Sequence, residues 1–321
     1  MLDILSITGP IYITIIIGYV CTRLGLFGKA DMRVFGKFVI NLALPALLFN
    51  SLSQRPLAEI LNGRYLLIYT VGSLVAGGLG LVWARLVMRQ NPTASAISAM
   101  GMCSSNSGFV GYPIALLTLG PVAGVLLGLN MIVENLLVIP LMLALADRGQ
   151  GAGSHWVQTL RQSLVNLVRN PMVMALVVGF VFALLQVKLP APVVRTINLF
   201  SQASGALSLF VIGGALVGLE IKGMLSPVLH ISAMKLLVHP LSVLATLLLA
   251  EAAGQLPMEP AMRAGAILLA ACPMMGIYPI LSHKYGQEGL SAAALLMATA
   301  ASFVSISTIL WLLHATPGWL G

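Results

Sequence analysis

Charged residues are scarce in this chain of 321 residues: they make up 8% of the sequence, whereas hydrophobic residues make up 59%. A soluble domain carries roughly 25% charged residues, and one soluble core cannot enclose so much apolar surface. The solvent for this surface must therefore be lipid. Because the apolar runs are long enough for spanning helices, we predict an all-α membrane protein.

Cysteines and catalytic motifs are also scarce, which disfavours several kinds of site. Cys21, Cys103 and Cys272 stand apart in apolar stretches without a C-x-x-C pair, so we predict buried free thiols, no metal site and no cofactor. The sequence contains neither H-E-x-x-H nor G-x-S-x-G, which argues against an intramembrane enzyme. The net charge is +8, but the basic residues stand singly in short loops, so we expect no nucleic-acid partner.

Apolar stretches that could cross a bilayer occupy nearly the whole chain. At ~20 residues per span, we predict ten transmembrane helices, at residues 4–24, 34–53, 65–88, 95–118, 121–146, 171–188, 193–219, 229–250, 262–286 and 290–315. The first stretch has no basic flank before it and is long enough to span. We therefore expect it to be retained as a helix rather than cleaved as a signal peptide.

The distribution of Lys and Arg predicts the orientation of these helices. The odd-numbered loops, with the helix ends beside them, hold twelve of these residues, the even-numbered loops hold five, and the two termini hold none. Cytoplasmic loops of membrane proteins are enriched in positive charge. We therefore predict a multi-pass inner-membrane protein with both termini outside, in the periplasm.

The longest predicted loop, residues 147–170, divides the chain into two halves, 1–146 and 171–321. A glycine-rich run at 149–153 is followed by apolar residues at helical spacing, among them Trp156, Leu160 and Leu164. This pattern predicts a cytoplasmic linker that contains a short interfacial helix. An ordinary linker with chance periodicity is the alternative.

The fourth and ninth predicted helices are interrupted in a similar way. Residues 103–114 read CSSNSGFVGYPI and residues 271–280 read ACPMMGIYPI, so both end in Tyr-Pro-Ile, once from Tyr112 and once from Tyr278. We call the separation of these two tyrosines the repeat offset. Each half has five spans, an odd number, so two copies in series have opposite orientations. This predicts a 5+5 inverted repeat with broken, crossing helices four and nine, the usual mark of a transporter site. The alternative is that each proline only kinks its helix.

In three stretches the chain resembles the auxin efflux carrier family, which includes the plant PIN carriers and bacterial proteins described as malonate or malate permeases. These stretches are residues 41–49, 106–113 and 272–286. The resemblance implies a fold like that of NhaA and the bile-acid transporters, with a scaffold of helices 1, 2, 6 and 7 and a mobile transport domain. It also implies elevator-type alternating access and a homodimer. The short loop between the halves departs from the plant carriers, and the spacing from Pro273 to Pro279 is one residue longer.

The two interruptions supply the residues that we expect to line the substrate site. They are Ser105, Asn106, Ser107, Gly108, Gly111, Tyr112 and Pro113 in the first, and Pro273, Met274, Met275, Gly276, Tyr278 and Pro279 in the second. Asn106 matches the position where the family resemblance implies an Asn that meets the substrate carboxylate, and an amide donor avoids the cost of a buried cation. The alternative roles are interhelical hydrogen bonding for Asn106 and ordinary packing for the Ser and Met residues.

Two further residues are candidates for coupling transport to an ion. Glu134 is the only carboxylate deep in a predicted span, and ionisable groups there are functional by default. Lys235 and His239 stand four residues apart on one helix face, before Pro240. We name Glu134 and His239 as coupling residues, with a structural acid as the alternative for Glu134. For Lys235 we expect that the side chain extends to the cytoplasmic headgroups.

Together these features predict a secondary transporter that moves a small organic anion, such as a malonate-like, malate-like or auxin-like carboxylate. A proton or sodium ion could be coupled to it, and membrane lipid surrounds it. A channel or a non-transporting receptor is the second hypothesis, and an intramembrane enzyme is the third. Two broken helices in an inverted repeat favour alternating access over an open pore.

The predicted orientation can be tested with fused reporters. A reporter attached after Gly321 should be active only if it is of a kind that works outside the cytoplasm. A reporter inserted at Gly151 should be active only if it is of a kind that works in the cytoplasm, because the basic loops stay inside. Paired alkaline phosphatase and fluorescent protein fusions measure both. A cytoplasmic C-terminus would overturn the orientation and, with it, the inverted repeat.

Overall fold

The computed structural model describes residues 2–53, 62–150, 169–187, 189–218, 224–254, 258–316 and 318–319. In these residues the regular structure is entirely helical, with no strand, so the predicted all-α class is confirmed. The interfacial helix that we predicted in the linker lies outside the described residues.

Six helical stretches are long and apolar enough to cross a membrane. They are Lys29–Ser53, Gly63–Leu86, Pro92–Gly149, Ala191–Ala215, Leu225–Ala252 and Glu288–Ala315. Three shorter apolar helices accompany them, Gly9–Arg23, Pro171–Leu185 and Pro260–Ala270. Pro92–Gly149 has 58 residues, enough for the two predicted helices that it contains. The total of ten transmembrane helices stays a prediction.

The chain divides into two compact units. Unit 1 comprises Met1–Asn62, Gly108–Leu129 and Val168–Gly218, and unit 2 comprises Gly63–Ser107, Asn130–Leu167 and Leu219–Gly321. The predicted helices 1, 2, 6 and 7 fall in unit 1, while helices 3, 8, 9 and 10 fall in unit 2. The stretch from the fourth to the fifth predicted helix is shared, because it leaves unit 2 after Ser107 and returns at Asn130.

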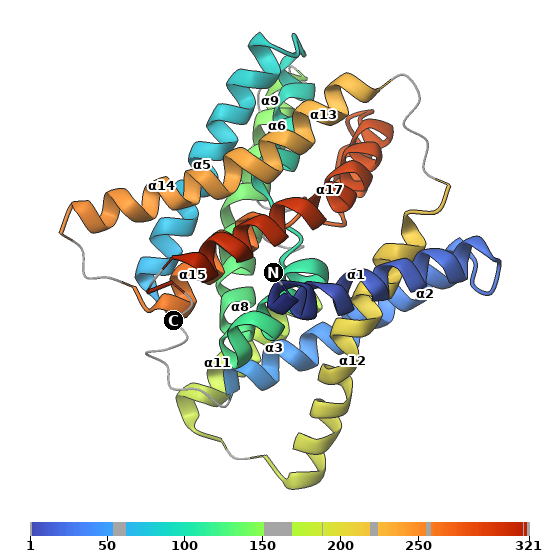
Figure 1. Ribbon diagram of the computed structural model, residues 1–321, viewed down its shortest axis with the longest axis vertical. Helices are drawn as coiled ribbons and strands as arrows, with labels where there is room; N and C mark the ends of the chain where they lie inside the picture. The colour runs from blue at the N-terminus through green and yellow to red at the C-terminus, as the bar shows by residue number, and fades with distance from the viewer. Residues whose placement is uncertain are drawn as a thin grey trace. The chain divides into compact units, whose positions relative to one another are not determined.

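Unit 1 is built around two close helix pairs. Helix α1 (Leu2–Arg23) crosses α12 (Ala191–Ala215), as Figure 1 shows, and a Cβ at Gly213 would overlap the carbonyl oxygen of Ile15. Helix α3 (Leu44–Ser53) packs on α11 (Pro171–Leu185), where the rings of Phe49 and Phe182 are 5.2 Å apart. The remaining helices of this unit are α2 (Lys29–Phe38), α7 (Tyr112–Leu119), η3 (Gly120–Val122) and the first part of α8 (Ala123–Val133).

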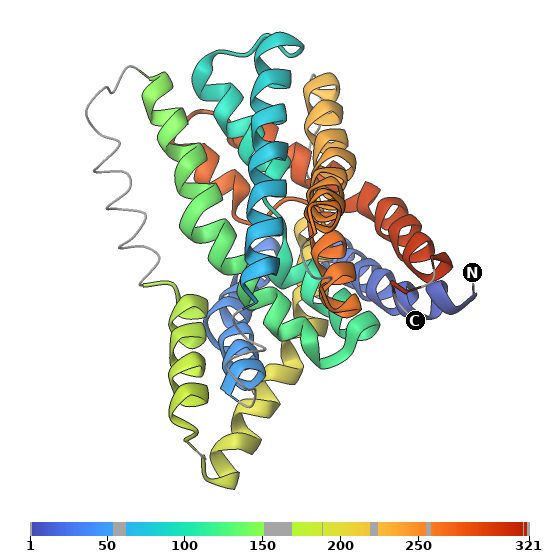
Figure 2. The same ribbon diagram turned by 90° about the vertical axis from the view of Figure 1, so that its left-hand side faces the viewer.

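Unit 2 is centred on the long helix α5 (Gly63–Leu86). Its neighbours are α6 (Pro92–Cys103) and α14 (His239–Ala252), and α6 in turn packs on α9 (Ile139–Gly149). Figure 2 shows these helices together. The other helices of the unit are α13 (Leu225–Ala233), α15 (Pro260–Ala270), α16 (Tyr278–His283) and α17 (Glu288–Ala315), and α17 packs on α13 and α16.

Four π-helical turns interrupt the described helices, and each ends two residues before a proline. They are η1 (Val39–Ala43) before Pro45, η2 (Ser107–Gly111) before Pro113, η4 (Glu134–Val138) before Pro140, and η5 (Met234–Val238) before Pro240. Proline lacks an N–H, and its ring collides with the carbonyl four residues earlier. A wider π turn relieves this collision, and such turns often mark functional sites. Two of these turns begin at or beside Glu134 and Lys235.

Both predicted interruptions are present in the described residues. Helix α6 ends at Cys103, residues 104–106 are not helical, and η2 follows. Helix α15 ends at Ala270, and α16 begins at Tyr278 after a non-helical segment. Each break therefore falls in the glycine- and proline-containing stretch that the sequence singled out.

The contact between α5 and α14 depends on a glycine, which provides a test of this packing. A Cβ at Gly72 would lie 2.7 Å from Cα of Val243, whereas a Cβ at Gly78 of the same helix would meet nothing within 4 Å. We expect Gly72→Ala to cost roughly 1–3 kcal/mol by overpacking, and Gly78→Ala to be neutral or mildly stabilising. The melting temperatures of both variants in detergent measure this. Equal melting temperatures would contradict the helix contact.

Candidate functional site

A continuous network of buried polar side chains lies inside unit 2. Its members come from α5, from residues 104–107, from α8 with η4, and from η5 with α14. They are Tyr65, Tyr69, Ser73, Ser105, Ser107, Asn130, Glu134, Lys235 and His239, and each is buried, with at most 5% of its surface exposed. Buried polar groups in a membrane protein need partners, and the geometry supplies a chain of hydrogen bonds between them.

Glu134 is the acceptor at the centre of this network. Its Oε1 accepts from the backbone N–H of Ser105 at 2.9 Å, from the Tyr69 hydroxyl at 3.1 Å and from the Ser107 hydroxyl at 3.4 Å. Ser105 and Ser107 belong to the first interruption, where the helix no longer satisfies its backbone. Glu134 therefore holds the interrupted segment in place, which is a structural role, and its role in coupling stays a prediction.

Two residues extend the network beyond Glu134. Asn130 donates from Nδ2 to the Ser107 hydroxyl at 3.2 Å and accepts from the Tyr65 hydroxyl at 2.6 Å. The rings of Tyr65 and Tyr69 are stacked with centroids 5.9 Å apart. One face of α5 thus presents two phenols, four residues apart, to the polar interior of the unit.

Lys235 is completely buried and its ammonium has three acceptors. Nζ donates to the Ser105 hydroxyl at 2.8 Å, to the backbone carbonyl of Ala270 at 2.7 Å and to Nδ1 of His239 at 2.7 Å. An ammonium carries three hydrogens, so each one has a partner. The expectation that Lys235 extends to the headgroups is therefore wrong, because a fully buried side chain with three internal acceptors does not reach the membrane surface.

The hydrogen bond from Lys235 fixes the tautomer of His239. Because the ammonium can only donate, Nδ1 must accept, and the ring hydrogen must be on Nε2. Nε2 lies 3.0 Å from the hydroxyl of Ser73, which accepts it. His239 is therefore a neutral imidazole that connects the lysine to α5.

The two interruptions are in direct contact within unit 2. The backbone N–H of Asn106 donates to the carbonyl of Pro273 at 2.8 Å. A Cβ on Gly276 would lie 3.8 Å from Nδ2 of Asn106, so the amide is next to the second interruption as well. Asn106 is 6% exposed and Gly276 is exposed. The amide is thus buried beside the second break, next to the point where that break reaches the surface of the described structure at Gly276.

The structure brings most of the predicted substrate-site residues together in unit 2. Around the contact between the breaks are Ser105, Asn106, Ser107, Pro273, Met274, Met275 and Gly276, with Met274 and Met275 buried. Tyr278 and Pro279 begin α16, and the Tyr278 ring packs against Gly101 of α6. Gly108, Gly111, Tyr112 and Pro113 belong to unit 1, where Gly108 lies beside Leu44 and Pro113 beside Gly205.

Sequence reasoning did not identify Tyr65, Tyr69, Ser73 and Asn130. A signal for two of them exists, because Ser73 and His239 are separated by 166 residues, and so are Tyr69 and Lys235. This separation equals the repeat offset of the two Tyr-Pro-Ile motifs. Ser73 and His239 are hydrogen-bonded to each other directly. Tyr69 and Lys235 are linked through the Ser105 hydroxyl, to which both donate hydrogen bonds.

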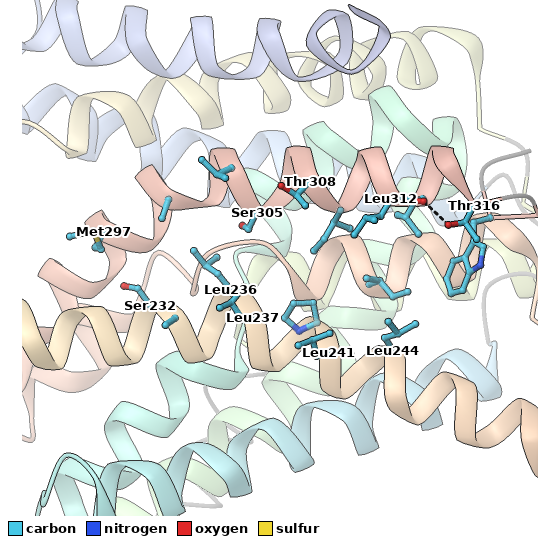
Figure 3. A pocket seen from close by; sticks show the side chains of 18 of the residues that line it. Ser232, Leu236, Leu237, Leu241, Leu244, Met297, Ser305, Thr308, Leu312 and Thr316 are labelled. Carbon is cyan, nitrogen blue, oxygen red and sulfur yellow. Dashed lines mark hydrogen bonds between the residues drawn. The ribbon is translucent and has the colours of Figure 1, made fainter. Parts of the chain in front are cut away.

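A separate apolar cavity of about 710 Å³ lies between η5, α13, α14, α15 and α17. Figure 3 shows Leu236, Leu237, Leu241, Leu244 and Leu312 in its wall, with the hydroxyls of Ser305 and Thr308. None of the predicted site residues lines it. Because the wall is almost entirely carbon, and several of its leucines are exposed, acyl chains of a bilayer can fill this cavity. We therefore place the candidate site at the polar network and the breaks.

Two of the three cysteines agree with their prediction. Cys103, the last residue of α6, and Cys272, two residues after the end of α15, are free and buried, whereas Cys21 is free but half-buried. Both buried thiols border the network, where they add no charge of their own in the thiol form.

Comparison with known proteins identifies the class of protein. Residues 8–312 match the model of a family described as "Membrane transport protein", and this match covers most of the chain. The chain belongs to this family of multi-pass membrane transporters, to which the auxin efflux carriers belong, so the predicted resemblance is confirmed.

Individual relatives agree with this assignment. The chain is 27% identical to the "Putative malonate transporter" of Rhizobium meliloti (strain 1021), over 98% of this chain and 97% of the relative. It is 26% identical to the "Uncharacterized transporter YfdV" of Escherichia coli (strain K12), over 73% of this chain and 75% of the relative. An "Uncharacterized transporter" of Methanothermobacter thermautotrophicus is 30% identical over 32% of this chain and 34% of the relative.

Proposed function

We propose that this membrane transporter is a secondary carrier of a small carboxylate, and that the substrate binds at Asn106 between the two interrupted helices. The observation that carries this proposal is the contact of the breaks: Asn106 bonds Pro273 through its backbone and places its amide beside the exposed Gly276. An amide there can donate to a carboxylate while the backbone freed by the breaks lines the site. Buried Met274 and Met275 provide an adaptable apolar wall.

Malonate is the first substrate to test, because a relative that spans nearly the same length is named as a malonate transporter. A dicarboxylate of this size suits a site with one amide donor and a short apolar wall. Malate and an aromatic carboxylate belong to the same chemical class and form the rest of the panel.

We propose that the fold is a 5+5 inverted repeat with crossing helices four and nine. The repeat offset supports this, since it relates the Tyr-Pro-Ile motifs and also relates the paired residues on α5 and on the helix that contains η5 and α14. In this proposal the halves are 1–146 and 171–321, the protein lies in the inner membrane as a homodimer, and both termini are periplasmic. Unit 2 is the domain that carries the substrate in an elevator-type cycle.

We propose that a proton is the coupled ion and that Glu134 carries it, with His239 as a neighbour in the same network. Glu134 is buried, and three donors surround its Oε1. Two of these donors, Ser105 and Ser107, belong to the first break, so Glu134 is hydrogen-bonded directly to it. Sodium is the alternative ion. A channel or a receptor is the alternative function, and counterflow separates these from a carrier, because only a carrier exchanges labelled for unlabelled substrate.

The substrate site is tested by two changes at Asn106, assayed as counterflow of labelled malonate in proteoliposomes. Asn106→Ala loses a hydrogen bond to a charged group, ~1.5–3 kcal/mol. Asn106→Asp is nearly isosteric but places a carboxylate against a carboxylate, a repulsion on the order of several kcal/mol at reduced dielectric. We therefore expect the Asp variant to lose much more affinity than the Ala variant.

Expression and melting temperature serve as controls for these two variants. If Asn106 only holds helices together, the two changes will lower the stability and the transport rate to a similar extent. An Asp variant that binds malonate as well as the wild type would show that Asn106 does not face the substrate. Absence of counterflow by the wild type with every carboxylate of the panel would overturn the proposed function.

Coupling is tested by Glu134→Gln. The amide keeps an oxygen that can accept from Ser105 and Tyr69, so the fold should survive, but it cannot take up a proton. We expect malonate accumulation driven by a pH gradient to disappear while malonate exchange continues, because exchange moves no net proton. Unchanged pH-driven accumulation in this variant would assign Glu134 a purely structural role.

A further inference from the structure

The ammonium of Lys235 lies where two helices end. Ala270, whose carbonyl accepts one of its hydrogens, is the last residue of α15, and Ser105 follows the end of α6 at Cys103 by two residues. The C-terminus of a helix carries partial negative charge from its unsatisfied carbonyls. In transporters with broken helices, such ends and the unwound backbone next to them coordinate the coupling cation. Here this position is occupied by a side chain of the protein itself.

Among the titratable residues described around the Lys235 ammonium, Glu134 supplies the negative charge that balances it. The titratable residues described around Lys235 are His239, Glu134, Cys103 and Cys272, with Tyr69 linked to it through the Ser105 hydroxyl and Tyr65 beside Glu134. Phenols and thiols are neutral near pH 7, and the hydrogen bond to Nδ1 makes His239 neutral. Glu134 reaches Lys235 through Ser105, which accepts from Nζ by its hydroxyl and donates to Oε1 by its backbone N–H.

We propose that Lys235 is a tethered coupling cation: its ammonium occupies the cation position between the interrupted helices and balances the charge of the carboxylate bound at Asn106. This inference rests on the proposed substrate site, since Asn106 is the residue next to Ser105 in the chain. It assigns a role in binding to a side chain that the sequence pattern assigned to the membrane surface. It also means that substrate binding requires no free sodium ion.

The arrangement explains how a proton and the substrate can be coupled. Ionised Glu134 and a bound carboxylate both gain from the single positive charge of Lys235, so each weakens the binding of the other. When Glu134 takes up a proton, the charge of Lys235 is left for the substrate. When the substrate leaves, Glu134 can release its proton and interact with the charge of the lysine again, through Ser105. Proton and carboxylate therefore bind together and leave together.

The first test compares Lys235→Ala with Lys284→Ala. Lys284 is the matched control, because its Nζ bonds Asp147 at 2.8 Å outside the network and its side chain is 65% exposed. We expect the wild type and the Lys284 variant to transport malonate equally well in sodium, potassium or choline chloride. Lys235→Ala should lose affinity by about tenfold or more, as expected for the loss of a nearby compensating charge. Strict dependence of the wild type on sodium, or wild-type affinity in Lys235→Ala, would overturn the proposal.

The second test replaces the missing ammonium from solution. Removal of the lysine side chain leaves the Ala270 carbonyl and Nδ1 of His239 without this donor, and leaves the Ser105 hydroxyl with the Tyr69 hydroxyl as its remaining donor in the network. Methylammonium carries three N–H donors, so methylammonium chloride should restore malonate affinity and raise the melting temperature of Lys235→Ala. Choline chloride at equal ionic strength should do neither. If methylammonium and choline act alike on this variant and on the wild type, Lys235 does not occupy a cation site.

Lys235→Ala could fail to fold, because it leaves Glu134 without its counter-charge. The double variant Lys235→Ala with Glu134→Gln removes both charges and keeps the acceptor on residue 134, and the rescue is then measured on it. The melting temperatures need no substrate. They therefore test the cation site even if the wild type transports no carboxylate, so failure of this inference is distinguishable from failure of the proposed function.

Discussion

The complete coordination of one buried ammonium organises unit 2. Lys235 is 0% exposed in a domain whose surroundings are lipid, and a charge in that position is destabilising by several kcal/mol unless it is paired and hydrogen-bonded. Its three acceptors come from three places in the chain: residue 105 after α6, residue 270 at the end of α15, and residue 239 on its own helix. Satisfying this one group therefore fixes both breaks relative to the helix that contains η5 and α14.

The breaks and the charge depend on each other. A helix that stops inside a membrane leaves carbonyl groups without partners, which is costly in hydrocarbon. A lysine alone in the same place would be equally costly. Together they lower both costs, because the ammonium donates to the carbonyl of Ala270 and Glu134 accepts the N–H of Ser105. Charged side chains from other helices thus supply partners for one carbonyl and one N–H group at the two breaks.

The sequence predicted the helices and the breaks better than it predicted the partners of the site. Apolar runs and the Gly-Tyr-Pro pattern are local signals, so the helical class and the interruptions after Cys103 and Ala270 were accessible from the chain. The partners of Lys235 are 130 and 35 residues away, and no local pattern reports a contact over that separation. Lys235 near a helix end looked like a residue that reaches the headgroups, because burial depends on tertiary packing.

The repeat offset offers a way to recover such partners. The pairs Tyr69 with Lys235 and Ser73 with His239 keep this offset although none of the paired residues are identical. A duplicated helix needs the same small or polar positions facing its copy, but the chemistry at those positions can diverge into donor and acceptor. Ser73 accepts from His239, and both Tyr69 and Lys235 lie within hydrogen-bond distance of the Ser105 hydroxyl. Comparison of positions at this offset, rather than of residue identities, would therefore have drawn attention to α5, since both residues of each pair lie in the same polar network.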